Sequence, residues 1–151
     1  MKKVLFVCTA NVCRSPMAEA IFNALAEERD LPFRAESAGT AALEGRSLDP
    51  NAVAALEEAG IYPEAHRARQ VRETMIEESE LVLAMSAKHV AALHRLCSNQ
   101  PRKIHALPQY ATGTYSKEGV PDPHGLTMIA YRSSVRQLYE YVERVVDRFG
   151  G

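Results

Sequence analysis

A cysteine and an arginine near the start of the chain, Cys8 and Arg14, are separated by five residues. Backbone N–H groups of a tight loop that enters a helix favour a bound dianion. The planar guanidinium of Arg14 can hold two oxygens of a phosphate group. The helix start and Arg14 both stabilise a thiolate at Cys8, and Ser15 can donate a hydrogen bond to the same sulfur. The predicted phosphate-binding loop comprises Thr9, Ala10, Asn11, Val12, Cys13, Arg14 and Ser15.

A purely structural interpretation of the same residues is that Cys8 ends a buried strand and Arg14 lies on the surface. Arg14 would then stand in the first turn of a helix, where the helix dipole disfavours a cation. A bound anion removes that conflict, so the phosphate loop is the better interpretation.

The flanking segments indicate the elements that position this loop. Residues 4–8 are continuously apolar and β-rich, which is typical of a strand buried on both faces. A helix should follow directly, with Ser15 as its N-cap and Pro16 in its first turn. The same alternation predicts strands at 33–37, 81–85 and 103–107, and helices at 50–59, 87–96 and 129–149.

Strands that alternate with helices indicate an α/β fold. We expect a single domain over residues 1–151, with a four-stranded parallel sheet, helices on both faces and the three-layer arrangement of flavodoxin or Rossmann-like proteins. Ligands of such sheets bind beyond the carboxyl ends of the strands. The loop after the first strand lies there.

Composition narrows the functional classes. The chain has 151 residues, 46% of them hydrophobic, and a formal net charge of −1, so a broad basic face for nucleic acid is not expected. Its apolar runs are shorter than the roughly 20 residues of a membrane span. The opening run resembles a short signal peptide but is interrupted by Thr9, Asn11 and Arg14. Three cysteines, an odd number, favour a reducing compartment, and we expect a cytoplasmic protein without a membrane partner.

Asp122 is the candidate general acid. A phosphate monoester needs a proton on its leaving oxygen, and a carboxylic acid on a loop can supply it and later activate water. Pro121 and Pro123 restrict the backbone on either side of Asp122. A plain surface turn is the alternative interpretation of this tripeptide.

Several of these segments resemble the low-molecular-weight protein tyrosine phosphatase family. The resemblance covers essentially the whole chain, through the loop and Pro16 to Glu19, Ser37 to Thr40, His66 with Ala68 to Gln70, Leu81 to Met85, and Pro121 to Pro123. It implies a hydrolase that forms a phosphocysteine intermediate, needs no metal or other cofactor, and acts as a monomer on phosphorylated protein. Phosphate, sulfate or vanadate should bind in its active site. The catalytic residues would be Cys8, Arg14 and Asp122, with a supporting hydrogen-bond network of Asn11, Ser15, Ser37 and His66.

The chain also departs from the family's pattern. Ala10 stands where the family usually has glycine, and we predict a negative φ there because a left-handed alanine is strained by roughly 1–2 kcal/mol. Leu43 and His124 occupy substrate-pocket wall positions that are often aromatic, which weakens stacking on a phenyl ring. One bacterial branch acts on phosphoarginine and shares Thr9 with this chain, but it tends to carry threonine where this chain has Val12. We therefore favour phosphotyrosine as substrate, with protein-arginine phosphatase as the alternative.

Other functions are less compatible with the residues present. An arsenate reductase needs a relay of further redox cysteines, and Cys97 stands alone in its half of the chain. A phosphate-binding module without catalysis would not need all three catalytic residues. Cys13 is either a protective disulfide partner of Cys8 or an apolar filler. No metal site is expected, because no further Cys or His ligands stand at finger-like spacings from Cys8 and Cys13.

Overall fold

A four-stranded parallel sheet forms the centre of the protein. The structure is a computed structural model, and it describes residues 1–115 and 118–150. The strands lie in the order β2-β1-β3-β4, and every neighbouring pair is parallel. This confirms the predicted sheet. The strands are β1 (Lys2–Cys8), β2 (Phe33–Gly39), β3 (Leu81–Ala84) and β4 (Ile104–Ala106).

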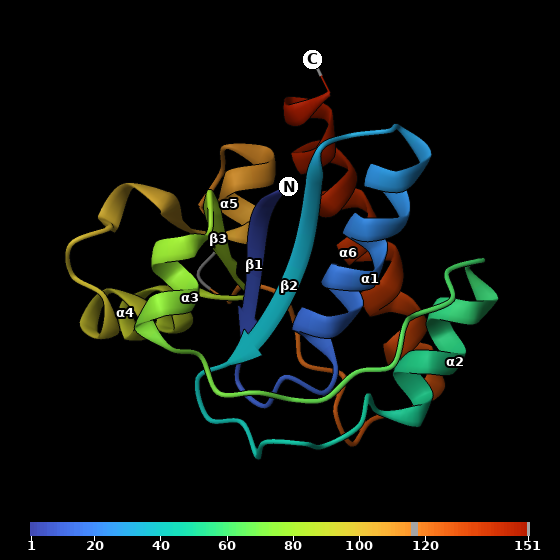
Figure 1. The fold of residues 1–151 in the computed structure, drawn as a ribbon. Helices are drawn as coiled ribbons and strands as arrows, with labels where there is room; N and C mark the ends of the chain where they lie inside the picture. The colour runs from blue at the N-terminus through green and yellow to red at the C-terminus, as the bar shows by residue number, and fades with distance from the viewer. Residues whose placement is uncertain (116–117, 151) are drawn as a thin grey trace.

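Helices cover both faces of the sheet, which completes the three predicted layers (Figure 1). One layer holds α1 (Arg14–Glu28), α2 (Pro50–Glu58), α5 (Leu107–Thr112) and α6 (Met128–Phe149), in which α6 packs against the other three. The opposite layer holds α3 (Glu73–Glu78) and α4 (Ala87–Leu96). A 3-10 turn, Pro101–Lys103, precedes β4.

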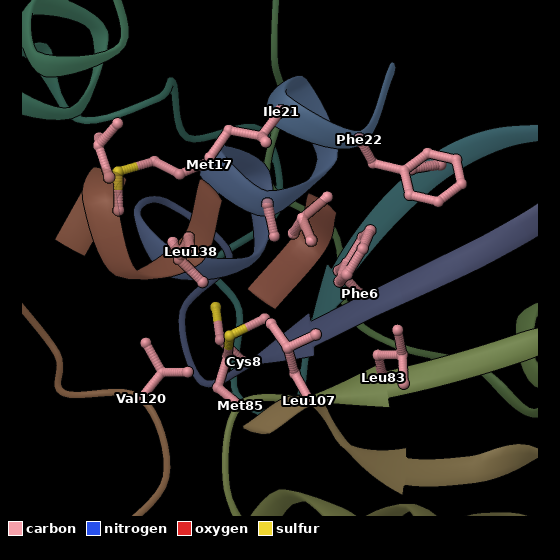
Figure 2. Packing of buried hydrophobic residues seen from close by; sticks show 14 of the residues in the cluster. Phe6, Cys8, Met17, Ile21, Phe22, Leu83, Met85, Leu107, Val120 and Leu138 are labelled. Carbon is pink, nitrogen blue, oxygen red and sulfur yellow. The ribbon is translucent and has the colours of Figure 1, made fainter. Parts of the chain in front are cut away.

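Strand β1 contributes to two separate cores because its side chains alternate between the faces. Val4, Phe6 and Cys8 pack with the layer of α1 and α6, whereas Leu5 and Val7 pack with α3 and α4. Figure 2 shows Phe6 and Cys8 beneath α1, with Met85 and Leu107 close to Cys8. Each buried side chain of this size stabilises the fold by roughly 1.5–3 kcal/mol. The carboxyl end of β1 is therefore fixed by the core.

Helix α6 closes the larger core with one apolar stripe. Its buried side chains recur at helical spacing, and at its end Phe149 stacks on Phe33 of β2 with ring centroids 4.4 Å apart. None of the helices in the described ranges has the length and apolar character that crossing a bilayer demands. The buried residues of the stripe are Tyr131, Val135, Leu138, Val142, Val145 and Val146.

Three local predictions need correction. Ser15 is not the N-cap of α1: the helix begins at Arg14 with Cys13 as its N-cap, and the Ser15 side chain turns toward the sulfur of Cys8 instead. The strand expected at 103–107 ends at Ala106, because Leu107 and Pro108 open the short helix α5. Neither α3 nor α5 was predicted, since six residues carry too little helical periodicity to recognise.

Candidate active site

The loop between β1 and α1 lies where the sequence placed it, at the carboxyl edge of the sheet. Cys8 is the last residue of β1 and is buried, and Arg14 is the first residue of α1. Ser15 Oγ lies 2.8 Å from Cys8 Sγ. Asn11 Nδ2 donates to Ser15 Oγ at 2.9 Å, and the Ser15 hydroxyl also lies 3.4 Å from the carbonyl oxygen of Ala38, to which it donates. The Ser15 side chain therefore links the sulfur of Cys8 to Asn11 and to the end of β2.

Asn11 holds the loop in shape through both its side chain and its backbone. Its φ is +60°, a left-handed conformation that asparagine tolerates better than most residues. Its amide donates to Ser15 and Ser37, and its side-chain oxygen accepts from the backbone N–H of Arg69 at 3.0 Å. His66 Nε2 donates to the Asn11 carbonyl at 2.7 Å. Both polar groups of the Asn11 side chain therefore have partners. These hydrogen bonds fix the loop against β2 and the 66–69 segment.

Arg14 is held with its guanidinium beside the Asp122 loop. It is only 8% exposed, and its Nη1 donates to the carbonyl of Val120 at 3.2 Å. Asp122 Oδ2 lies 3.6 Å from Arg14 Nη2, and the Asp122 side chain is half-exposed. Val120 is tied in turn to the end of β3 through the carbonyl of Met85. The structure thus brings the proposed clamp and the proposed acid together from opposite ends of the chain.

A histidine outside the motif completes the support of the loop. Ser86 Oγ caps α4 by accepting from the backbone N–H of His89, and it lies 2.7 Å from His89 Nδ1. The other ring nitrogen, Nε2, lies 2.8 Å from Thr9 Oγ1, so each ring nitrogen has a hydroxyl partner. Burial, assisted by the charges of Arg14 and Lys88, lowers the pKa of His89 to about 4. His89 is therefore neutral at physiological pH, and its ring joins Thr9 of the loop to Ser86 at the start of α4.

Cys13 lies in a different environment from Cys8. Its Sγ is 3.8 Å from His124 Nδ1 and 3.7 Å from the hydroxyl of Tyr131. Tyr131 donates to Asp49 Oδ2 at 3.0 Å. Burial, together with the negative charges of Asp49 and Asp122, raises the pKa of Cys13 to about 12. Cys13 is therefore a protonated thiol at neutral pH and does not compete with Cys8 as a nucleophile.

The remaining predicted residues have different outcomes. The prediction that Ala10 avoids a positive φ is confirmed. The left-handed residue of the loop is Asn11 instead. His124 stands beside the loop, whereas the Leu43 side chain is 67% exposed, so its place in the pocket wall stays a prediction. All three cysteines are free thiols here, so the Cys8–Cys13 disulfide stays a prediction.

Sequence reasoning missed two residues that support the site. His89 follows β3 at the same edge of the sheet as the loop, so topology was the one signal that could have found it. Glu19 accepts a hydrogen bond from Ser37, and burial raises its pKa. It lies one turn into α1, within the Pro16 to Glu19 segment that carries the family resemblance, but no role was assigned to it from the sequence.

Comparison with known proteins agrees with this geometry. The sequence model of the family described as "Low molecular weight phosphotyrosine protein phosphatase" matches residues 3–149. A low-molecular-weight protein-tyrosine-phosphatase of Streptomyces coelicolor is 40% identical over 81% of this chain and 77% of its own length. A protein-arginine-phosphatase of Bacillus subtilis is 34% identical over 96% of this chain and 95% of its own length. A solved structure of the arginine phosphatase YwlE, a cysteine-to-serine mutant with a phosphorylated active-site serine, superposes with a TM-score of 0.92, covering 97% of this chain and 94% of that one at 33% identity.

Proposed function

Because this chain belongs to the low-molecular-weight phosphotyrosine protein phosphatase family of cysteine-based phosphatases, we propose that it dephosphorylates phosphotyrosine in proteins through Cys8. The observation that carries the proposal is the position of Cys8 Sγ. The sulfur lies 2.8 Å from Ser15 Oγ, at the start of the phosphate loop. Arg14, whose side chain is buried, stands at the other end of the same loop. A thiolate and a phosphate clamp on one short loop are the two groups that phosphoryl transfer to cysteine requires.

The reaction proceeds in two steps. The Cys8 thiolate attacks phosphorus, the bond from phosphorus to the leaving oxygen breaks, and Asp122 gives that oxygen its proton. Water then attacks the phosphocysteine, and the Asp122 carboxylate takes a proton from it. The S–P bond breaks, which releases inorganic phosphate and restores the Cys8 thiolate. Arg14 holds two phosphate oxygens throughout. No metal or other cofactor enters either step.

Two observations support these roles. Asp122 lies 3.6 Å from Arg14, so a phosphate bound by that guanidinium places its ester oxygen near the carboxyl group. The YwlE structure carries phosphate on an active-site serine that replaces a cysteine, which supports a covalent phospho-enzyme in the proposed mechanism. We assign this activity to one domain over residues 1–151, working as a monomer in the cytoplasm, where a reducing environment keeps the thiol of Cys8 available.

Phosphotyrosine is favoured over phosphoarginine by Val12. This side chain is buried in the loop and offers no hydrogen bond, so nothing at that position recognises the N–H groups of a phosphorylated guanidinium. Protein-arginine phosphatase is the second candidate, because a relative with that name matches 96% of this chain. The half-exposed carboxylate of Asp122 is the group that would face such a substrate.

Comparing kcat/KM on matched peptides that carry phosphotyrosine or phosphoarginine separates the two candidates. We expect the higher value on phosphotyrosine, with turnover unchanged by EDTA and abolished in Cys8→Ser. A higher kcat/KM on phosphoarginine would establish the alternative. Binding of vanadate without turnover of either peptide would contradict both and indicate a phosphate-binding module. The matched control is Cys97→Ser, which leaves the loop intact and should retain activity.

A further inference from the structure

We propose that Cys13, Asp49 and His124 form a zinc-binding site beside the phosphate loop, and that zinc bound there inhibits the enzyme. The three side chains come from the loop, the N-cap of α2 and the segment before α6. Each offers one donor atom, and the three atoms lie within 4.8 Å of one another. A thiolate, an imidazole and a carboxylate are the ligand types that Zn²⁺ takes in proteins.

The distances between the donor atoms resemble the edges of a zinc tetrahedron. Zinc binds sulfur at about 2.3 Å and nitrogen or oxygen at about 2.0 Å, which places ligand atoms roughly 3.3–3.6 Å apart. Cys13 Sγ and His124 Nδ1 are 3.8 Å apart, and His124 Nδ1 and Asp49 Oδ2 are 3.6 Å apart. Small side-chain movements therefore suffice to bind the ion. The fourth coordination position is left to water.

The ligands are already held in place by the fold. Asp49 Oδ1 accepts from the backbone N–H of Asn51 at 2.8 Å, and Asp49 Oδ2 accepts from the buried hydroxyl of Tyr131. The backbone N–H of Asp49 donates to the Val12 carbonyl at 3.0 Å, which joins α2 to the loop that carries Cys13. Zinc sites commonly orient their ligands through such outer hydrogen bonds.

The local charge also favours a cation. Asp49 and Asp122 both oppose a negative charge on Cys13, and the same two carboxylates attract a divalent ion. Zinc binding forms the bond to sulfur and releases the thiol proton of Cys13 to solvent. His124 binds through the lone pair of Nδ1 and keeps its proton on Nε2.

The position of the site predicts its effect on catalysis. Cys13 directly precedes Arg14, and the backbone N–H of His124 donates to Asp122 Oδ1 at 3.1 Å. A zinc ion that joins Cys13 to His124 therefore ties the loop of the proposed acid to the phosphate loop. We expect zinc to lower turnover even at saturating substrate. This inhibition rests on the proposed function, whereas the binding itself does not.

Binding is tested in the Cys8→Ser protein, which removes the other thiol of the loop. Titration with Co²⁺ should give a thiolate-to-metal charge-transfer absorption and the visible bands of tetrahedral cobalt, and Zn²⁺ should displace it at one equivalent. Adding Cys13→Ser should abolish the charge-transfer absorption. Adding His124→Ala, at a half-exposed side chain, should weaken zinc binding at least tenfold, whereas the control His94→Ala on α4 should not change it.

Two results would overturn the site. One is a Cys8→Ser protein that gives no thiolate-to-cobalt absorption. The other is an absorption that survives both Cys13→Ser and His124→Ala. Inhibition of the otherwise unmodified enzyme that is purely competitive, and equal in the His124→Ala variant, would place the inhibitory zinc on Cys8 instead. Because binding is measured without the nucleophile, a failed site and a failed phosphatase assignment are distinguishable.

Discussion

Replacing Gly39 with alanine should damage catalysis without touching a catalytic residue. Gly39 ends β2 opposite Cys8, and a Cβ built on it would lie 2.4 Å from the carbonyl oxygen of Thr9 and 3.2 Å from the carbonyl carbon of Ala10. An ordinary contact begins near 3.4 Å, so the phosphate loop must move by about 1 Å. A displacement of that size costs on the order of 100-fold in rate, and overpacking costs about 1–3 kcal/mol of stability.

The assay compares kcat on a phosphopeptide and the urea midpoint of unfolding for Gly39→Ala and a matched control. Gly150→Ala is that control, because its Cβ meets nothing closer than 3.6 Å and the residue has a negative φ. We expect a loss of about 100-fold in kcat for Gly39→Ala and none for Gly150→Ala. A Gly39→Ala enzyme with unchanged kcat and stability would refute the claim that β2 fixes the loop.

Three further predictions concern the groups around the loop. Asp122→Ala should slow hydrolysis of alkyl phosphates far more than that of para-nitrophenyl phosphate, whose leaving group needs little protonation; equal losses in kcat would contradict the acid role. Asn11→Ala removes three side-chain hydrogen bonds, two buried and one part-buried, so urea unfolding should show a loss of about 3 kcal/mol, and a loss below about 1 kcal/mol would show that the loop holds without them. His89 is neutral in the folded state with a pKa of about 4 against 6.5 when unfolded, so stability should fall as pH drops from 6.5 to 4. In His89→Gln the urea midpoint should fall less over that window, and an equal fall would assign the effect to other groups.

Local sequence signals were strong enough to predict the sheet and the position of the loop. The apolar run ending at Cys8 predicted a strand buried on both faces. In a parallel sheet, the turn that follows such a strand lies at the ligand-binding edge. Asn11 was placed in the supporting network by the family resemblance, and the structure puts its φ at +60°, a left-handed conformation that asparagine tolerates better than most residues. In each case the information lay within a few residues, where backbone stereochemistry and hydrophobic periodicity act.

The cluster around Cys13 could not be predicted in that way. Cys13 and His124 are 111 positions apart, and their contact depends on how α2 and α6 pack. Asp49 directly precedes the helix predicted at 50–59, but no site role was predicted for it, and its second oxygen meets Tyr131 through tertiary packing alone. The Ser15 error has a related cause. A serine beside a helix start usually caps it, but here the cysteine sulfur provides a competing partner that propensity does not include.

The two cysteines of the loop show how a short segment keeps distinct chemistries apart. Cys8 ends β1, and its sulfur lies 2.8 Å from the hydroxyl of Ser15. Cys13 lies buried on the same loop near Asp49, where burial, together with the charges of Asp49 and Asp122, raises its pKa and keeps it protonated; in the proposed site a zinc ion replaces that proton. Because Arg14 follows Cys13 directly, both environments act on one backbone. A ligand on either side therefore changes the geometry available to the other.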